Sequence, residues 1–327
     1  MNILVTGGAG YIGSITTRLL CERGYSCVVL DTLENGHLTS VDPRAELVVG
    51  SVGDQALVEG LLRDHQVDAV MHLAGYIEVA ESKEFPEKYY ANNAEAPRRM
   101  LAAMQAVGTS ALVFSSTAAV YGEPTRVPIL EDDPKKPINP YGASKLVFEE
   151  ALDEAAADWG LRSIRFRYFN VAGAWPDGSL GEAHMPETHI IARILEALLD
   201  AGETGETPQF SLFGADYPTP DGTCVRDYIH VCDLACAHAL ALEALNTGED
   251  GGVYNLANGQ GYSNREVITT CEQVTGHSLQ VAKESRRPGD PAVLVADATR
   301  ARERFGWQPE YPALVDMIAH AWAWYHS

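Results

Sequence analysis

The sequence predicts an α/β protein built on a parallel sheet with helices on both faces, joined to a smaller and less regular C-terminal α/β lobe. Three observations lead to this fold class. Short β-branched runs alternate with helical patterns through the first half of the chain. A glycine-rich turn separates the first such run from the first helical pattern. The chain has 327 residues, of which 46% are hydrophobic, enough for a large core.

The expected elements follow one another in a regular order. Strands are expected at the apolar runs 3–6, 27–31, 47–49, 69–73 and 111–115. Helices are expected at 14–23, 55–65, 92–106 and 140–157, with a further strand and helix over 227–245. Segments 173–186, 201–208 and 215–223 are polar or rich in Gly and Pro, which is typical of loops. We therefore expect a nucleotide-binding domain over residues 1–170, onto which 225–260 packs back, and a substrate lobe formed mainly by 171–327.

Composition excludes several classes of function. The net charge of −21 argues against nucleic acid or an anionic membrane surface as a partner. The chain has no apolar run long enough to span a membrane, and its first residues lack the features of a secretory signal, so we expect a cytoplasmic protein. Cys232 and Cys236 lie four residues apart, but no second His or Cys pair completes a metal site. No metal is predicted.

The glycine-rich turn has the spacing of a dinucleotide site. Gly7, Gly10 and Gly13 lie between the first strand and the first helix, where Cβ atoms would block a tight turn and a bound pyrophosphate. The N-terminus of that helix offers free N–H groups to phosphates. Asp31 ends the second strand eighteen residues after Gly13, where a carboxylate accepts hydrogen bonds from ribose hydroxyls and repels a 2′-phosphate. The sequence therefore predicts a Rossmann-like sheet that binds NAD rather than NADP.

A tyrosine and a lysine at helical spacing are the leading catalytic candidates. Tyr141 and Lys145 share one face of the helix that begins near Pro140. An ammonium beside a phenol stabilises the phenolate, so Lys145 is expected to lower the pKa of Tyr141 and make it a base. Thr117 follows the buried run 111–115, at the sheet edge where ligands bind, and is expected to hold a substrate hydroxyl.

These motifs resemble those of the extended short-chain dehydrogenases/reductases, and within them the UDP-glucose (UDP-galactose) 4-epimerase family. The resemblance runs almost from end to end. It rests on residues 6–13, 141–145, 167–174, 225–231 and 287–290. The first two motifs are shared across the superfamily, whereas the last three are more specific to the epimerases.

The resemblance implies a reversible epimerisation at C4 of a UDP-hexose, with a tightly bound NAD as both oxidant and reductant. Tyr141 would take the proton from the sugar O4 while C4 gives its hydride to the nicotinamide. The 4-keto sugar would then turn in the pocket and receive the hydride on its other face. By the same resemblance, Thr117 would bind O4 and Lys145 the nicotinamide ribose. A homodimer formed through two helices of each subunit is also implied.

The resemblance further implies two sets of contacts. Those with the cofactor are expected at Gly7, Gly10, Tyr11, Ile12, Gly13, Asp31, Asn35, Gly36, Ser51, Val52, Leu73, Ala74, Gly75, Asn92, Ser115, Tyr141, Lys145, Tyr168 and Phe169. Those with the substrate are expected at Thr117, Tyr141, Asn170, His189, Leu212, Phe213, Arg226, Arg287, Asp290 and Leu294. Within the second set, Leu212 and Phe213 would lie along the uracil. Two arginines would let an otherwise acidic protein bind a diphosphate.

The chain departs from the family pattern at several positions. Ser51 stands where relatives usually have an Asp that contacts adenine, Ile77 where some have a Lys, and Ile15 where a His is common. His189 stands where other members use an Asn near the substrate. Leu294 occupies a position that gates room for an N-acetyl group, and it is smaller than the Tyr of strict UDP-glucose enzymes. We therefore hypothesise that UDP-GlcNAc and UDP-GalNAc are also accepted; the alternative is that Leu294 only packs and nearby bulk closes the pocket.

Three alternatives remain. Nucleotide-sugar dehydratases and decarboxylases place an Asp or Glu directly after the hydroxyl residue, whereas Thr117 is followed by Ala118 and Ala119, which disfavours elimination. Epimerases that act on UDP-glucuronate or on GlcNAc lipids are harder to exclude. A uronate would call for an extra cation near C6 of the sugar, and none is evident in the sequence. A silent NAD-binding scaffold protein is the third alternative, and such proteins usually lose the Tyr or the Lys.

Overall fold

The computed structural model describes residues 1–204, 207–287 and 290–327, except for the side chains of residues 201–204. Within those residues the largest element is a seven-stranded sheet whose strands all run parallel to their neighbours. The strands are β1 (Asn2–Thr6), β2 (Ser26–Asp31), β3 (Glu46–Val49), β4 (Ala69–His72), β5 (Ala111–Thr117), β6 (Arg162–Tyr168) and β10 (Gly252–Leu256). Their order is β10-β6-β5-β4-β1-β2-β3, so the strand order reverses between β1 and β4. A crevice at the carboxyl ends of these two strands is where such sheets bind ligands.

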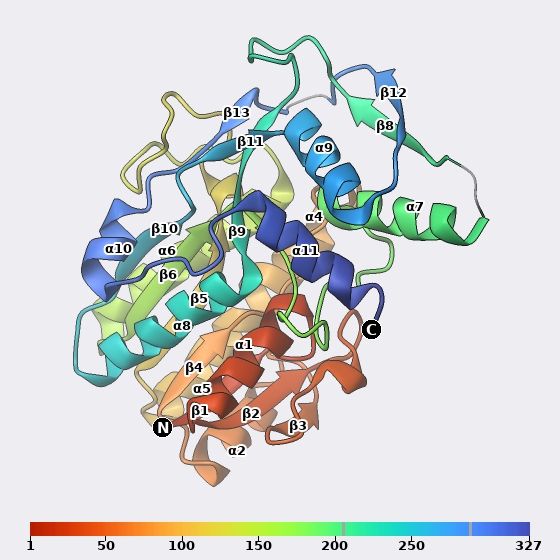
Figure 1. Ribbon diagram of the computed structural model, residues 1–327. Coiled ribbons are helices and arrows are strands. Elements are labelled where there is room, and N and C mark those ends of the chain that lie inside the picture. Colours follow the sequence, from red (N-terminus) through yellow and green to blue (C-terminus); the bar gives the residue numbers. More distant parts are fainter. Residues whose placement is uncertain (205–206, 288–289) are drawn as a thin grey trace.

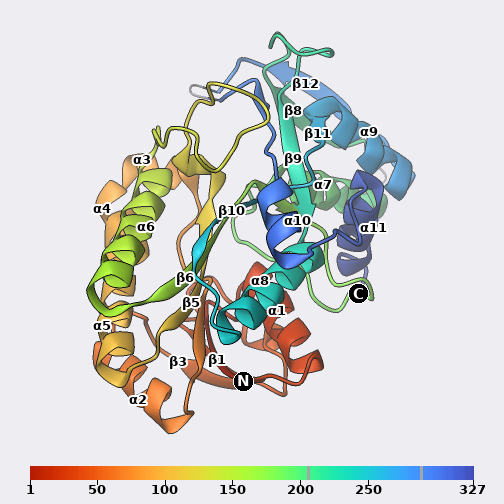
Figure 2. The same cartoon turned by 90° about the vertical axis from the view of Figure 1, so that its left-hand side faces the viewer.

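Helices cover both faces of this sheet (Figure 2). One face carries α2 (Gln55–Asp64), α3 (Val79–Glu84), α4 (Pro86–Tyr90), α5 (Ala96–Val107) and α6 (Pro140–Trp159). The other carries α1 (Tyr11–Glu22), α8 (Val231–Asn246) and α10 (Thr299–Phe305). The β1 residues alternate between the two cores, because successive side chains of a strand point to opposite faces. Ile3 and Val5 pack with residues of α8, whereas Leu4 packs with residues of α2, α5 and α6. The predicted doubly wound parallel sheet is confirmed.

Element bounds differ from the expected ones at two helix starts. Helix α1 begins at Tyr11, directly after the turn, rather than at residue 14. The helix expected from residue 92 is a π-helical turn over Ala91–Glu95 that passes into α5 at Ala96. Pro97 stands at the junction of the π-helical turn and α5, where the backbone is already helical and the proline supplies no N–H donor. Single-turn π segments often occur at functional sites, and Asn92 lies in this one.

A second lobe forms from the C-terminal half of the chain (Figure 1). It contains α7 (Ile190–Thr204), α9 (Asn264–Thr275) and α11 (Leu314–Trp324), which share one core with Phe210, Leu212 and Tyr228. Its strands are β7 (Asn170–Ala172), β8 (Gln209–Phe213), β9 (Val225–His230), β11 (Gly261–Ser263), β12 (Gln280–Glu284) and β13 (Val293–Leu294). Between the lobes, α8 and β10 return to the large sheet, whereas β9 pairs with β7, β11 and β13. The domain boundary at residue 170 stays a prediction.

Among the described residues, no helix combines the length and the apolar character that crossing a membrane requires.

Candidate active site

The glycine-rich turn after β1 is held by two contacts that exclude any side chain. Gly7 has a φ of 76°, and a Cβ there would lie 2.5 Å from the main-chain nitrogen of Ala74, in the loop after β4. A Cβ on Gly13 would lie 2.0 Å from the carbonyl oxygen of Gly7. These two glycines therefore bring the turn, the first turn of α1 and the loop after β4 together at the point where the strand order reverses.

Gly10 is required by a different partner. A Cβ at Gly10 would meet only the Gly7 carbonyl, at an ordinary 3.5 Å, so no contact among the described residues demands glycine there. Gly10 is the N-cap of α1, and the first N–H groups of a helix have no partner inside it. A pyrophosphate of NAD fits both facts, because it needs close approach of the backbone and free N–H donors.

Only the main chain of Tyr11 can contribute to this turn, because its side chain is bound elsewhere. Its buried phenol donates a hydrogen bond to the carbonyl oxygen of Gly173, 2.6 Å away and 162 residues later in the chain. The expected contact of Tyr11 with the cofactor is therefore restricted to its main chain, and its side chain instead fastens α1 to the loop after β7.

Asp31 is both a structural and a ligand-binding candidate. Its buried carboxylate accepts hydrogen bonds from the backbone N–H of Ala9, at 3.0 Å, and of Leu33, at 2.8 Å. Each oxygen keeps a further lone pair for a ribose hydroxyl. Nearby Gly36 lies so close that a Cβ there would be 3.0 Å from Asp31 Oδ1.

The other expected adenosine contacts differ in exposure. Asn35 and Ser51 are exposed and Val52 is buried. The Ser51 hydroxyl accepts a hydrogen bond from the N–H of Gly53 at 3.1 Å.

Tyr141 and Thr117 meet where β5 ends. Asn139 caps α6 by accepting a hydrogen bond from the N–H of Gly142 at 2.8 Å. A Cβ on Gly142 would lie 2.5 Å from the carbonyl of Ala119, so this glycine lets the first turn of α6 rest on the end of β5. The Thr117 hydroxyl thereby lies beside the Tyr141 phenol and acts to lower its pKa, against the larger effect of burial.

Three effects act on the pKa of Tyr141 in the structure. Burial raises the pKa of the Tyr141 phenol, the Thr117 hydroxyl lowers it, and the carboxylate of Glu78 raises it further. Lys145 donates from Nζ to the carbonyl oxygen of Ser115 at 3.1 Å, and its lowering of the Tyr141 pKa stays a prediction. Burial also lowers the pKa of Lys145 to about 8.

Two residues near the catalytic pair escaped the sequence analysis. Glu78 faces Tyr141, and its carboxylate accepts a hydrogen bond from the Thr188 hydroxyl at 2.9 Å. Asn93 is buried and holds the loop after β4 through its bonds to the N–H and carbonyl of Tyr76, at 2.9 and 3.0 Å. Neither could be found by spacing, since Glu78 lies on an irregular loop and Asn93 reads as an ordinary helix residue.

The remaining cofactor candidates surround Lys145. A Cβ on Gly75 would lie 3.0 Å from Lys145 Nζ, so the loop that holds Leu73, Ala74 and Gly75 approaches the lysine at Gly75. The hydroxyls of Ser115 and Tyr168 are hydrogen-bonded to each other, and Phe169 follows at the end of β6. Asn92 is partly exposed in its π-helical turn.

A buried ion pair fixes the strands that carry these groups. The guanidinium of Arg167 on β6 donates to both carboxylate oxygens of Glu149 on α6, at 2.9 and 2.5 Å. The Ser116 hydroxyl on β5 donates to the same carboxylate at 2.5 Å. One carboxylate thus joins β5, β6 and α6 behind the catalytic residues.

The expected nucleotide end of the site lies in the second lobe. Arg226 on β9 forms an ion pair with Asp290 at 3.0 Å, and Arg287 lies over the ring of Phe213, 4.3 Å from its centroid. Leu294 on β13 pairs with Arg226. Pro288 and Gly289 of the expected motif lie outside the described residues.

Leu212 is a correction at this end of the site. Its side chain is buried in the core beneath α7 and α9, so it does not lie along a uracil, and only its backbone can contact a ligand. Strand alternation explains the difference, because Leu212 and Phe213 point to opposite faces of β8.

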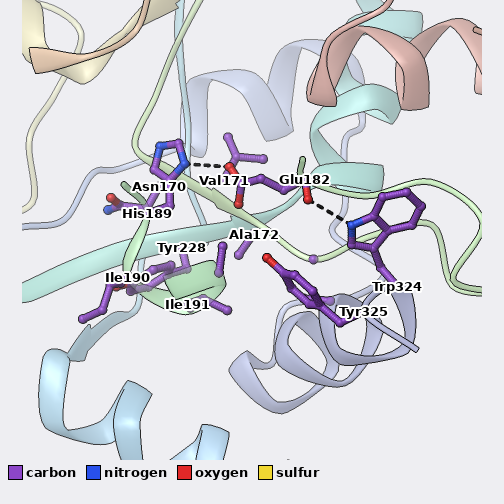
Figure 3. Close-up of a pocket in the computed structure, with 13 residues that line it drawn as sticks. Asn170, Val171, Ala172, Glu182, His189, Ile190, Ile191, Tyr228, Trp324 and Tyr325 are labelled. Atoms are coloured by element: carbon purple, nitrogen blue, oxygen red, sulfur yellow. Dashed lines mark hydrogen bonds and ion pairs between the residues drawn. The ribbon is translucent and has the colours of Figure 1, made fainter. Parts of the chain in front are cut away.

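Asn170 and His189 line a pocket in the second lobe, together with Glu182, Tyr228 and Trp324 (Figure 3). Asn170 donates from its side-chain amide to the carbonyl of Asp227 at 3.1 Å. His189 is hydrogen-bonded to Glu182 Oε1 through Nδ1, at 2.6 Å. Of the sequence candidates, the structure thus brings Tyr141, Thr117 and Lys145 to the sheet edge and places Asn170, His189 and the arginines on the second lobe.

Three comparisons place this geometry among known proteins. The sequence model described as the NAD dependent epimerase/dehydratase family matches residues 3–257. A curated UDP-glucose 4-epimerase from Azospirillum brasilense is 48% identical, over 99% of this chain and 92% of the relative. The crystal structure of the UDP-glucose 4-epimerase from Brucella ovis in complex with NAD superposes with a TM-score of 0.94 at 44% identity, covering 98% of this chain and 97% of that one. That from Bifidobacterium longum, in complex with NAD⁺ and UDP, gives 0.92 at 36% identity, covering 100% and 98%.

Proposed function

The chain belongs to the NAD-dependent epimerase/dehydratase family and, within it, to the UDP-glucose 4-epimerases, and from that premise we propose how its own residues carry out the reaction. The protein is an NAD-dependent isomerase that inverts C4 of a UDP-hexose. NAD, when bound, accepts a hydride from the sugar C4 and returns it, and its positive nicotinamide ring favours a phenolate beside it. The residues of the protein bind the substrate, orient its sugar and transfer the proton of its O4.

Tyr141 is the proposed base. Its phenol takes the proton of the sugar O4 and returns it when the 4-keto sugar is reduced on the opposite face. The observation that carries this assignment is the contact of the Tyr141 phenol with the Thr117 hydroxyl at the carboxyl end of β5. Thr117 can hold O4 against the phenol, and hydrogen bonding to the phenolate stabilises it.

Lys145 is proposed to bind the nicotinamide ribose rather than to contact the phenol directly. Its ammonium is anchored by Ser115 and lies next to Gly75, in the crevice that also holds the glycine-rich turn. A lysine has three N–H donors, so two remain for ribose hydroxyls.

The UDP is proposed to lie on the second lobe, against Arg226, Arg287 and Phe213. Arg226 and Asp290 are paired with each other. A diphosphate would compete with Asp290 for that guanidinium, which lets Asp290 turn to a ribose hydroxyl. Asn170 and His189, which line the pocket of Figure 3, are proposed to complete the contacts with the sugar and the diphosphate.

Elimination is the less favoured chemistry at this site. Thr117 leads into Ala118 and Ala119, so no acid follows it. Glu78 is the carboxylate that faces Tyr141, and it is held by the Thr188 hydroxyl on the other lobe.

N-acetylated sugars are a proposed second substrate class. The support is Leu294, whose side chain is half-buried at the end of β13 beside the proposed UDP site. A Leu leaves more room than a Tyr for an N-acetyl group at C2 of the sugar. We also propose a homodimer, which light scattering can test, and a cytoplasmic location, in keeping with the finding that all six cysteines are free.

A product assay tests the proposed function. The purified protein is incubated, without added NAD, with UDP-galactose and separately with UDP-GalNAc, and the 4-epimers are separated by chromatography. Formation of UDP-glucose without added cofactor is expected, as is some formation of UDP-GlcNAc. Turnover of UDP-galactose with no detectable turnover of UDP-GalNAc would overturn the N-acetyl proposal and leave the epimerase assignment intact.

A further inference from the structure

A group of four ligand-type side chains lies in the loop that joins β7 to α7. Glu182, His184, Glu187 and His189 each offer one nitrogen or oxygen ligand atom, and these four atoms all lie within 4.8 Å of one another. The chain segment that supplies them is short. The two carboxylate side chains are buried, at 9% and 3% exposure, whereas the two imidazoles are partly exposed, at 20% and 41%; these four side chains are called the cage below.

The distances within the cage suit a small tetrahedral ion. Glu182 Oε1 lies 3.1 Å from His184 Nδ1 and 2.6 Å from His189 Nδ1. Glu187 approaches the same two nitrogens at 3.9 and 3.4 Å. Zinc bonds of about 2.0–2.2 Å in tetrahedral geometry place the ligand atoms roughly 3.3–3.5 Å apart. The observed separations of 2.6–3.9 Å bracket this value, and Glu187 faces His184 through Oε2 and His189 through Oε1. An ion would replace the hydrogen bond between Glu182 and His189 and draw the four side chains to an even spacing.

An independent observation shows that one ligand oxygen lacks a partner. The side chain of Glu187 is only 3% exposed, and its Oε2 is buried with no hydrogen-bond partner among the described residues. The other oxygen accepts from the N–H groups of Thr188 and His189, at 2.6 and 2.7 Å, which keeps the carboxylate from turning away. A buried carboxylate oxygen without a donor is costly, and such a group signals a missing cation or donor.

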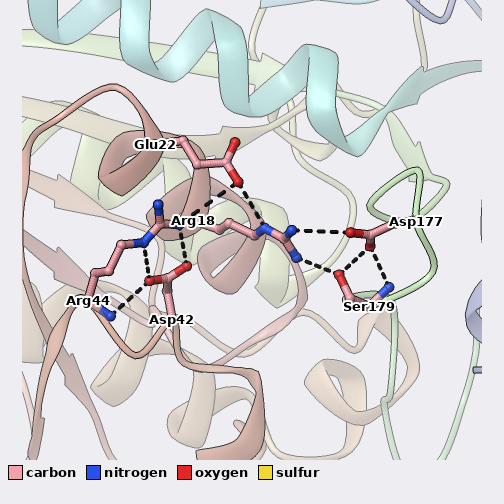
Figure 4. A network of polar contacts seen from close by, with 6 residues as sticks. All are labelled: Arg18, Glu22, Asp42, Arg44, Asp177 and Ser179. Atoms are coloured by element: carbon pink, nitrogen blue, oxygen red, sulfur yellow. Dashed lines mark hydrogen bonds and ion pairs between the residues drawn. The ribbon is translucent and has the colours of Figure 1, made fainter.

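The cage is anchored from two other elements. Trp324 of α11 donates from its ring N–H to the carbonyl of Glu182 at 2.9 Å, and the ring of Tyr11 on α1 meets that of His184 edge to face. The preceding loop is tied to α1, because Arg18 contacts both Asp177 and Ser179 (Figure 4). These contacts restrict the conformations of the loop, so ion binding would cost little conformational entropy.

We propose that Glu182, His184, Glu187 and His189 form a binding site for one divalent transition-metal ion, of which Zn²⁺ fits best. Imidazole nitrogens with carboxylate oxygens are ligands that Zn²⁺ prefers, whereas Ca²⁺ and Mg²⁺ prefer oxygen alone. With four protein ligands, the site is structural. It fixes the loop that carries His189 and Glu182 into the pocket lined by Asn170. This site is additional to the epimerase chemistry and does not depend on it.

The absence of a metal was predicted because no His or Cys pair completes a site with Cys232 and Cys236. Cys232 and Cys236 lie on α8 and are free. The spacing of the two His and two Glu residues has no common motif, so only the folded loop brings them together.

A zinc-binding experiment on the full chain tests the proposal. Protein stripped with EDTA is dialysed against ZnCl₂, and bound metal is measured by elemental analysis, with affinity from a competition titration. The expected result is one Zn²⁺ per chain and a rise in the unfolding temperature with Zn²⁺. Ca²⁺ and Mg²⁺ at the same concentration should give no such rise.

Two variants and a control locate the ion. Glu187→Gln and His184→Gln should each weaken Zn²⁺ binding at least about tenfold. His277→Gln, at an exposed histidine in the loop after α9, should bind as the unmodified protein does. Circular dichroism before metal addition checks folding. Failure of the unmodified protein to bind Zn²⁺, or equal binding by all variants, would overturn the proposal, whether or not the variants are active as epimerases.

Discussion

The Nζ atom of Lys145 donates a hydrogen bond to the carbonyl oxygen of Ser115, 3.1 Å away, and this is its only hydrogen-bond partner in the described part of the chain. The lysine is thus buried next to the catalytic tyrosine without a counter-ion. A buried charge without a counter-ion opposes folding when no cofactor is bound. The lysine is therefore explained by its proposed binding of the nicotinamide ribose and not by a contribution to stability.

Removing this charge should stabilise the cofactor-free protein. Burial lowers the pKa of Lys145 from 10.5 to about 8, so between these values the folded state binds fewer protons than the unfolded one and stability rises with pH. Below pH 8 the full penalty applies, roughly 3 kcal/mol at most, offset by about 1 kcal/mol for the bond to Ser115.

Compared in the cofactor-free state, Lys145→Met is therefore expected to be more stable than the unmodified protein at pH 7, and this difference should shrink towards pH 10. The variant should also lose epimerase activity. Urea unfolding at the two pH values measures this. The exposed Lys135→Met serves as control and should change neither stability nor activity. A Lys145→Met protein that is less stable at pH 7 would show that the lysine is not destabilising.

Two glycines of the turn should respond differently to alanine. Gly13→Ala places a Cβ 2.0 Å from the Gly7 carbonyl and is expected to lower both stability and NAD content. Gly10→Ala places it at an ordinary 3.5 Å, so the protein should fold with nearly normal stability and yet lose bound NAD. Thermal unfolding and the NAD released on denaturation distinguish the two. Normal NAD content in Gly10→Ala would place the pyrophosphate elsewhere.

The ion pair between Glu149 and Arg167 should be strongly asymmetric to mutation. Glu149→Gln leaves a buried guanidinium without a counter-ion and is expected to cost about 3–5 kcal/mol of unfolding free energy. The double variant Glu149→Leu/Arg167→Met removes both charges and should cost much less. Denaturant unfolding of the single and double variants measures the difference. Additive losses would show that the two residues act independently.

Specificity for the C2 substituent should change at Leu294. Leu294→Tyr is expected to reduce turnover of UDP-GalNAc by at least about tenfold while leaving that of UDP-galactose within about threefold, since extra bulk in a pocket is worth about 1–3 kcal/mol of discrimination. The ratio of kcat/KM for the two sugars is the measurement. An unchanged ratio would mean that nearby residues set the size of the pocket.

The sequence was sufficient for features that depend on local spacing. The strand and helix periods predicted the parallel sheet, and the three glycines and Asp31 predicted the cofactor edge, because each follows a strand directly. The pairing of Tyr141 with Thr117 could also be anticipated, since both stand at the carboxyl edge of the sheet.

Features that depend on tertiary contacts could not be predicted in this way. Strand β6 carries three arginines and does not read as a buried strand, yet Arg167 is buried because Glu149 neutralises it. Glu78 approaches Tyr141 from a loop, and Leu212 turns into the core. The bond of Lys145 to the Ser115 carbonyl could not be predicted either, because helical spacing places two residues on one face but does not fix where a long side chain points.

The most direct test of the proposed mechanism is Tyr141→Phe. The variant keeps the ring and loses the hydroxyl, so it should retain bound NAD and the unfolding temperature of the unmodified protein. Its kcat for UDP-galactose should fall by at least about 10²–10⁴-fold, the usual contribution of a general acid–base group. Released NAD and the rate of UDP-glucose formation, measured on the same preparation, decide the question. Undiminished epimerisation by a folded, NAD-loaded Tyr141→Phe protein would contradict the role of Tyr141 as the base.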